Sequence, residues 1–281
     1  MKKVILSTVL GVVALSANGD IYLNSGVKDY SNSKTKVDGK TNTIGMNYKY
    51  NGSSININFL KDEVDKEHPM TKKSIETLKV KKYNLNYRYS VNNKFDLKAS
   101  YIKILDNLAP TDQGKVYGIG AQYNFFKGFG TSFDVYKSDY ETFNVKQYDL
   151  SLFKAFKIGE VKSKFTAIVK KIDIDGDNYG NYRFDDKDYL TTGVKLNAMY
   201  NGYFGGVGAS FGKRAFTVLK SGTKVQHHAM EQDKTYMASF GKKFQNFDLM
   251  LSYSFQNGIE LPENQNDVDT KVTSLMLKYK F

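Results

Sequence analysis

The 281-residue sequence predicts an all-β chain that closes into an antiparallel, up-and-down transmembrane β-barrel. Three observations support this fold class. Apolar and polar residues alternate over segments long enough to cross a bilayer as tilted strands. Tight turns and longer polar joints follow one another in alternation along the chain. A mean hydropathy of −0.49 accompanies an aromatic content of 14%, as expected when one face of each strand meets lipid and the other meets water.

The composition excludes several other classes. With no Cys, the chain has no disulfide scaffold, thiolate zinc site or cysteine nucleophile. The negative mean hydropathy and the single long apolar run exclude a helical membrane protein, whose spans need about 20 apolar residues each. The aromatic excess argues against disorder. A soluble secreted β-sandwich is the remaining structural alternative.

The N-terminus has the pattern of an export signal. A short basic start precedes the apolar run Val4–Val13 and a group of small residues. This predicts a secretory signal peptide over residues 1–17, cleaved after Ser16 or Ala17, because the run is too short to span a bilayer. We therefore expect residues 18–281 to form the barrel, in the outer membrane of a Gram-negative bacterium.

The joints divide the remaining chain into hairpins. The tight joints, where Asn-Gly pairs are strong hairpin signals, are Asn51-Gly52, Asn92-Asn93, 127–130, 158–160, Asn201-Gly202 and Gln245-Asn246. The longer polar joints cover 31–40, 63–79, 107–115, 141–145, 174–187, 218–233 and 258–269. About 14 strands of about 10–13 residues result, close to the 9–11 residues that cross a bilayer. The number falls to 12 if the weak segments near 131–141 and 145–157 are not strands.

The C-terminal segment carries the most specific pattern. Leu275, Leu277, Tyr279 and Phe281 alternate up to a terminal aromatic residue. This resembles the assembly signal of bacterial outer-membrane barrels, and in size and strand number the chain resembles the small porins of the 14-stranded class. The resemblance implies short periplasmic turns, longer extracellular loops, and the barrel-assembly machinery, outer-membrane lipid and lipopolysaccharide as partners. The chain departs from many of these porins in having no Trp, so Tyr and Phe would form the interfacial girdles.

Parity assigns the charged strand residues to the lumen, since the apolar series must face lipid. The expected lumen basic residues are Lys49, Arg88, Lys98, Lys164, Lys170, Lys195, Lys243, Lys278 and Lys280, and the expected acidic residues are Asp96, Asp134, Asp149 and Asp248. The basic excess focuses a positive potential in a confined pore, which predicts modest anion preference. The alternative is that these lysines only snorkel toward headgroups or solvate the lumen without selecting ions.

We expect a water-filled pore, because a barrel of about 14 strands is wider than its side chains fill. A plug would need spare residues, and no joint is much longer than 16 residues. The joints 63–79 and 218–233 are the longest candidates for folding inward. Monomeric and trimeric states are both compatible with the sequence.

The chain shows no pattern of catalytic residues. All three His lie in predicted loops, without the spacing to a Ser that a nucleophilic mechanism needs. Asp173, Asp175 and Asp177 begin like a calcium loop, but Asn178 stands where such a loop needs Gly. Only a weak calcium contact is conceivable there, so we expect no enzyme activity, cofactor or nucleic-acid partner.

The predicted function is passive diffusion of small hydrophilic solutes through an outer-membrane porin. Two alternatives remain. One is a substrate-specific channel for acidic sugars or oligosaccharides, against which the presence of only three Arg argues. The other is a non-conducting surface adhesin or structural barrel.

Overall fold

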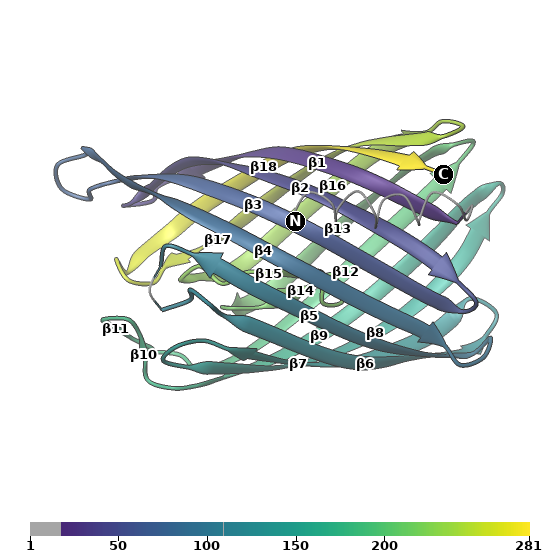
Figure 1. Ribbon diagram of the computed structural model, residues 1–281, viewed down its shortest axis with the longest axis horizontal. Helices are drawn as coiled ribbons and strands as arrows, with labels where there is room; N and C mark the ends of the chain where they lie inside the picture. The colour runs from purple at the N-terminus through teal and green to yellow at the C-terminus, as the bar shows by residue number, and fades with distance from the viewer. Residues whose placement is uncertain (1–17, 109) are drawn as a thin grey trace, which may run out of the picture.

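Fourteen antiparallel strands form one closed barrel in the computed structural model, which describes residues 18–108 and 110–281 (Figure 1). The predicted signal peptide, residues 1–17, lies outside the described residues. The barrel strands are β1 (Gly19–Ser31), β2 (Lys36–Tyr50), β3 (Ser53–Glu67), β4 (Ser74–Ser90), β5 (Phe95–Asp106), β6 (Lys115–Phe126), β7 (Phe129–Asp139), β8 (Asn144–Ile158), β9 (Val161–Asp175), β12 (Asp188–Tyr200), β13 (Tyr203–Arg214), β16 (Met230–Lys243), β17 (Phe247–Glu260) and β18 (Gln265–Lys280). The predicted fold class is thereby confirmed, and the two weak segments are the strands β7 and β8.

Each strand pairs with the next one in this series, and β1 closes the wall by pairing with β18. That last pairing runs in register from Asp20 opposite Lys280 to Ser31 opposite Asp269. Closure matters in lipid because an unpaired backbone N–H or C=O costs several kcal/mol there. Within residues 18–108 and 110–281, no helix is long and apolar enough to cross a membrane.

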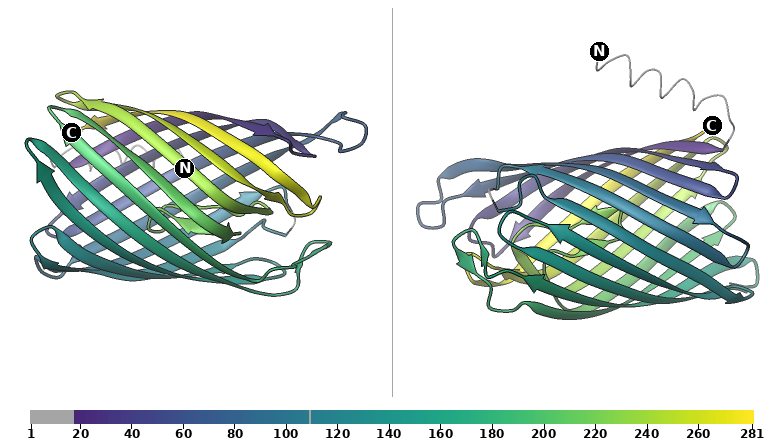
Figure 2. Two further views of the ribbon diagram at one scale, coloured as in Figure 1. Left: turned by 180° about the vertical axis from the view of Figure 1, so that it is seen from behind. Right: turned by 60° about the horizontal axis from the view of Figure 1, so that its bottom comes forward.

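The two ends of the barrel differ. Tight turns and the C-terminus occupy one end, and the longer connections gather at the other (Figures 1 and 2). Two short hairpins lie within the longer connections: β10 (Asn178–Tyr179) pairs with β11 (Tyr182–Arg183), and β14 (Val218–Leu219) pairs with β15 (Lys224–Val225). Below, these ends are called the turn end and the loop end.

The outer face of the wall is apolar. Large side chains such as Ile44, Ile119 and Leu251 are exposed on it, with 50%, 70% and 54% of their surface accessible. Of the C-terminal series, Leu275, Leu277 and Tyr279 also face outward, while the ring of Phe281 lies against Gly19. So much exposed apolar surface is unusual for a protein in water and is suited to lipid.

Phe and Tyr gather at the turn end. The rings of Phe244 and Phe247 stack with centroids 4.4 Å apart, and those of Phe126 and Phe129 stack at 5.1 Å. Phe has no polar group, so these rings extend the apolar outer face up to the tight turns. The predicted girdle of Tyr and Phe stays a prediction.

The strands are longer than the sequence suggested. The expected joint 63–79 contracts to residues 68–73, because β3 and β4 continue as a hairpin that projects beyond the rim (Figure 1, left). In this extension the alternation persists, but charged residues such as Lys61 and Glu63 take the outward positions, which hid it from a search for apolar alternation. This connection therefore does not fold into the lumen.

Irregularities in the pairing concentrate near the loop end. The register shifts there occur at Lys36/Gly39, Val64/Lys66, Phe211/Arg214, Gln232/Lys234 and Gly258/Glu260. A further shift, Asn124/Phe126, adjoins a tight turn. Between these regions the register is continuous, so each face of the wall keeps one chemical character.

Leu251→Lys tests which face meets lipid. Leu251 is outward and half-exposed, so a charge there should lower the free energy of unfolding by about 2 kcal/mol if lipid covers it. The measurement is urea unfolding in lipid vesicles, followed by heat-modifiable gel mobility. Ser252→Lys is the matched control, because Ser252 lines the lumen and its change should cost much less. Equal losses for the two variants would contradict the assignment of faces.

Candidate functional site

The connection between β13 and β16 folds into the barrel. This segment, residues 215–229, is called the lumen loop below; it contains the small hairpin β14–β15, which lies within the barrel in Figure 1. It includes part of the predicted joint 218–233. The sequence alone does not determine whether any joint enters the lumen.

Side chains of the barrel wall form hydrogen bonds with backbone groups of the lumen loop. These bonds replace the ones that a neighbouring strand would supply. The amide of Gln147, which is 1% exposed, donates to the Val218 carbonyl at 2.8 Å and accepts from the Val218 N–H at 2.7 Å. Lys82 donates to the Val225 carbonyl at 2.9 Å, and Asn84 donates to the Gly222 carbonyl at 3.2 Å. Backbone groups that leave the wall thus find partners inside it, as buried polar groups must.

An aromatic cluster anchors the base of the lumen loop. Phe216 is fully buried, with ring centroids 4.8 Å from Phe143, 5.6 Å from Tyr179 and 5.8 Å from Phe184. Aromatic pairs at these separations add to the stabilisation from apolar burial. This part of the loop end is therefore packed with side chains.

Buried histidines complete the anchoring. The Nε2 atom of His227 lies 2.9 Å from the Asp106 carboxylate, and both side chains are fully buried. Burial, with the charges of Lys82 and Lys28, holds the pKa of His227 well below its usual range. Burial and the adjacent His227 similarly lower the pKa of His228. Both rings are therefore neutral at pH 7.

A cavity of about 910 Å³ occupies the lumen beside the lumen loop. Among residues 18–108 and 110–281, no acidic side chain lines it, whereas seven basic ones do: Lys162, Lys164, Lys195, Arg214, Lys220, Lys224 and Lys278. Amide and hydroxyl side chains make up much of the remainder. A confined space lined by charges of one sign focuses potential and concentrates ions of the opposite sign.

The lumen loop contributes two of these cations, Lys220 and Lys224, which are exposed to the lumen. Enclosure by the barrel, followed by the charge of Lys195, lowers the pKa of Lys220. Enclosure and the charges of Lys220, Lys28 and Lys82 lower that of Lys224. Both lysines therefore lose their proton at a lower pH than a lysine in open water does.

The lumen is narrower toward the loop end. There a cavity of about 90 Å³ lies between the lumen loop and the wall, lined by residues that include Lys28, Asp62, Lys82 and both buried histidines. Lys28 of β1 and Asp62 of β3 form an ion pair at 2.5 Å in this wall. Residues 224–228 of the lumen loop line the opposite side, so the loop occupies part of the lumen here.

The four acidic residues expected in the lumen each form an ion pair. Asp96 pairs with Arg88, Asp134 with Lys98, and Asp248 with Lys280, each at 2.5 Å, and Asp149 pairs with Lys170. The structure brings these eight residues together in pairs. Their acidic charges are consequently balanced within the wall.

The other expected basic residues have different surroundings. Lys164 lies over the Phe153 ring at 4.3 Å, Lys195 and Lys278 line the large cavity, and Lys278 is 3.7 Å from Asp20. Lys243 donates to the Met199 sulfur at 3.0 Å, and Lys49 lies opposite Ser54 at the turn end. In the described part of the chain, neither Lys164 nor Lys195 is within 4.0 Å of a carboxylate. These two therefore contribute net positive charge.

Several lumen charges escaped the sequence interpretation. The sequence predicts Lys220 and Lys224 as loop residues, and tertiary contacts place them in the lumen. Lys28 and Asp62 could have been found by extending the alternation of β1 and β3 by a few residues. Lys36, which pairs with the fully buried Glu260 at 2.5 Å, could not have been found in this way. It lies beside a register shift that breaks the alternation.

The proposed calcium contact lies at the end of β9, which holds Asp173 and Asp175, and in the connection after it, which holds Asp177. Asp177 pairs with Lys187, and Asp173 lies 2.9 Å from Lys171. Among the described residues, no group of three or more acidic or histidine side chains is arranged to hold a metal ion. The lysines compete for these carboxylates in this conformation.

Comparison with known proteins shows similarity of structure and not of sequence. No protein-family model and no curated protein sequence matches the chain. Among solved structures, the CymD monoaromatic hydrocarbon channel has a TM-score of 0.61 at 8% identity, covering 96% of this chain and 90% of that one. A Pseudomonas aeruginosa FadL homologue has a TM-score of 0.58 at 10% identity, covering 96% and 92%. The Acinetobacter baumannii outer membrane protein Omp33 has 0.51 at 10%, covering 95% and 99%. The chain thus has the closed β-barrel fold found in outer-membrane channels.

Proposed function

We propose that the protein is an outer-membrane porin that passes small hydrophilic solutes by passive diffusion, with a preference for anions. The large lumen cavity carries this proposal, because seven basic side chains and no acidic one line it. The apolar outer face supports the membrane location, since the barrel would expose it to water otherwise. Such a pore needs no catalytic residue, because solutes follow their concentration gradient.

The pairing of the lumen acids supports the proposed preference for anions. Asp96, Asp134, Asp149 and Asp248 are each neutralised by a neighbouring cation. Lys195, Lys220 and Lys224 are exposed in the lumen without such a partner in the described chain. An entering anion is therefore attracted, and a cation of the same size is repelled.

The lining favours hydrophilic solutes. Most of the residues that line the cavity carry a basic, amide or hydroxyl group, and such groups replace part of the hydration shell of a polar solute. The hydrocarbon channel CymD is similar in fold alone. The proposal of a hydrophilic pore rests on the lining of this chain.

The double variant Lys195→Gln and Lys224→Gln should reduce anion preference. Each lysine contributes about 0.6 kcal/mol at about 7 Å in water, so each loss lowers the local anion concentration about threefold. The measurement is the reversal potential across a planar bilayer in a KCl gradient. Lys154→Gln, at an outward position beside Phe126, is the matched control and should leave selectivity unchanged. Cation preference in the wild type would contradict the proposal.

Shortening the lumen loop should raise the single-channel conductance several-fold. Residues 218–225 can be replaced by two glycines, because the Gln226 N–H already donates to the Thr217 carbonyl at 2.9 Å and the ends are adjacent. Correct folding is checked by heat-modifiable mobility. If folded wild-type and shortened proteins both fail to conduct, the non-conducting adhesin or structural barrel becomes the better interpretation.

Raising the pH should weaken the anion preference. The change should occur at a lower pH than an ordinary lysine would give. The pKa values of Lys220 and Lys224 are lowered, so these groups lose their charge at a pH below the ordinary value of about 10.4. Reversal potentials recorded between pH 5 and 10 measure the effect, because the pKa of Lys224 is lowered to about 7. The double variant Lys220→Gln and Lys224→Gln should show a smaller change over this interval, and an unchanged pH dependence would contradict the assignment.

A further inference from the structure

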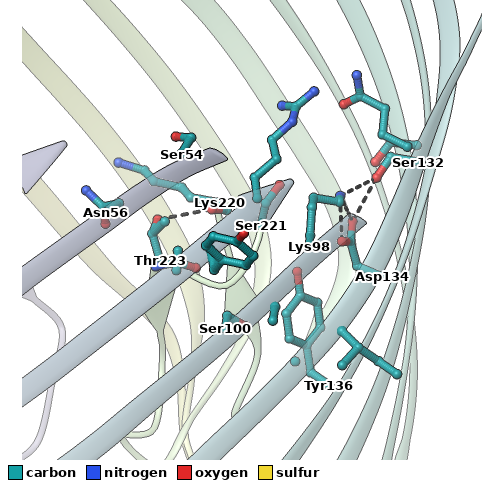
Figure 3. Close-up of a pocket in the computed structure, with 18 of the residues that line it drawn as sticks. Ser54, Asn56, Lys98, Ser100, Ser132, Asp134, Tyr136, Lys220, Ser221 and Thr223 are labelled. Carbon is teal, nitrogen blue, oxygen red and sulfur yellow. Dashed lines mark hydrogen bonds and ion pairs between the residues drawn. The ribbon is translucent and has the colours of Figure 1, made fainter. Parts of the chain in front are cut away.

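A second cavity, of about 250 Å³, lies where the tip of the lumen loop meets the wall formed by β3–β9. Figure 3 shows Lys220, Ser221 and Thr223 of the tip on one side, and Lys98, Ser100 and Ser132 of the wall on the other. The approach is close: a Cβ added to Gly222 would lie 2.5 Å from the Ser100 hydroxyl. The tip and wall together enclose this space.

Cations exceed anions around this cavity. Arg88, Lys98, Lys164 and Lys220 line it, whereas Asp134 is the only acidic side chain that the described part of the chain contributes. Asp134 is bound to Lys98, and Arg88 is bound to Asp96. Lys164 and Lys220 are therefore the cations that remain available, since neither lies within 4.0 Å of a carboxylate in the described residues.

Other cations lie close to each of the two available lysines. Lys164 is close enough to Arg88, Lys195 and Lys98 for their charges to act on it, and Lys195 acts on Lys220 in the same way. Like charges held together in this way are relieved by a multiply charged anion. The loop tip brings Lys220 to the wall, so the lumen loop is needed for the arrangement.

The kind of cation points to the kind of anion. Arg binds both carboxylates and phosphates through two parallel hydrogen bonds, whereas Lys acts as a compact charge with three donors. Two lysines therefore select an anion mainly by its charge, which is about −1.5 to −2 for a phosphate monoester at pH 7 and −1 for a carboxylate. The one Arg of this lining, Arg88, is already paired with a carboxylate. Hydroxyl and amide groups surround the lysines, among them Ser54, Asn56, Ser100 and Thr166. They supply donors and acceptors for a hydroxylated carbon skeleton.

We propose that this cavity binds the phosphate monoesters of small polyhydroxylated compounds, with Lys164 and Lys220 holding the phosphate. The site deepens the proposed porin function and rests on it for access from the lumen. It continues into the large cavity, whose lining shares Asn56, Lys164, Lys220 and Thr223 with it. A phosphorylated solute would pause there on its way through the barrel.

Glucose 6-phosphate is the probe, with glucose and gluconate as neutral and carboxylate comparisons. In single-channel recordings in KCl, glucose 6-phosphate should reduce the current at lower concentration than gluconate does, and glucose should have little effect. Lys164→Gln and Lys220→Gln should each weaken this block about threefold, and the double variant about tenfold. Lys278→Gln is the matched control, because it removes a charge from the large cavity and not from the smaller one.

Three results would overturn the site: equal block by gluconate and glucose 6-phosphate, no weakening in the double variant, or an equal weakening in Lys278→Gln.

Calorimetric titration of the detergent-solubilised full chain with the same probes separates this site from the proposed function. Binding without conductance would reject the porin function and keep the site. Conductance without binding would keep the porin function and reject the site. Heat-modifiable mobility verifies that each variant has folded.

Discussion

Closure of the backbone hydrogen-bond ladder is the constraint on which the rest of the molecule depends. Once β1 pairs with β18, every strand of the described barrel has two neighbours, and lipid can cover the outer face without meeting unpaired peptide groups. The same closure fixes the lumen, because alternate side chains must then point inward. Leu196 and Phe165 face outward, and successive residues of a strand point to opposite faces. Their neighbours Lys195 and Lys164 therefore face the water inside the barrel.

The lumen loop solves a different problem with similar chemistry. It leaves the wall and loses the ladder, yet the Gln147 amide replaces one strand partner by bonding both the N–H and the C=O of Val218. Lys170 connects this contact to the ion pairs of the wall, since it donates to the Val218 carbonyl at 3.1 Å and pairs with Asp149. The charge balance of the lumen and the position of the loop are therefore coupled.

Local patterning predicted the wall, and tertiary contacts determined the lumen. Alternation in short windows predicted about 14 strands, with the segments that form β7 and β8 left open, because most strands have a clear apolar outward row. It also placed Asp149 and Lys170 on the same inward face, where they pair. It failed where the outer row becomes charged, as in the extension of β3 and β4 past Lys61. It also failed at Lys36, beside a register shift, and at Lys220 and Lys224. Nothing in the pattern of residues 215–229 indicates that a glutamine of β8 will hold them inside the barrel.

The uneven distribution of register shifts has a consequence for how such a chain can vary. A one-residue insertion in the continuous middle of a strand would exchange the lipid row and the water row for the rest of that strand. Near the rim, where Gly258/Glu260 and Val64/Lys66 already absorb an extra residue, the same insertion disturbs a short stretch of exposed backbone. Changes in length can therefore accumulate at the loop end while the membrane part stays fixed in length. The rim can diversify toward new surroundings without any cost to the seal against lipid.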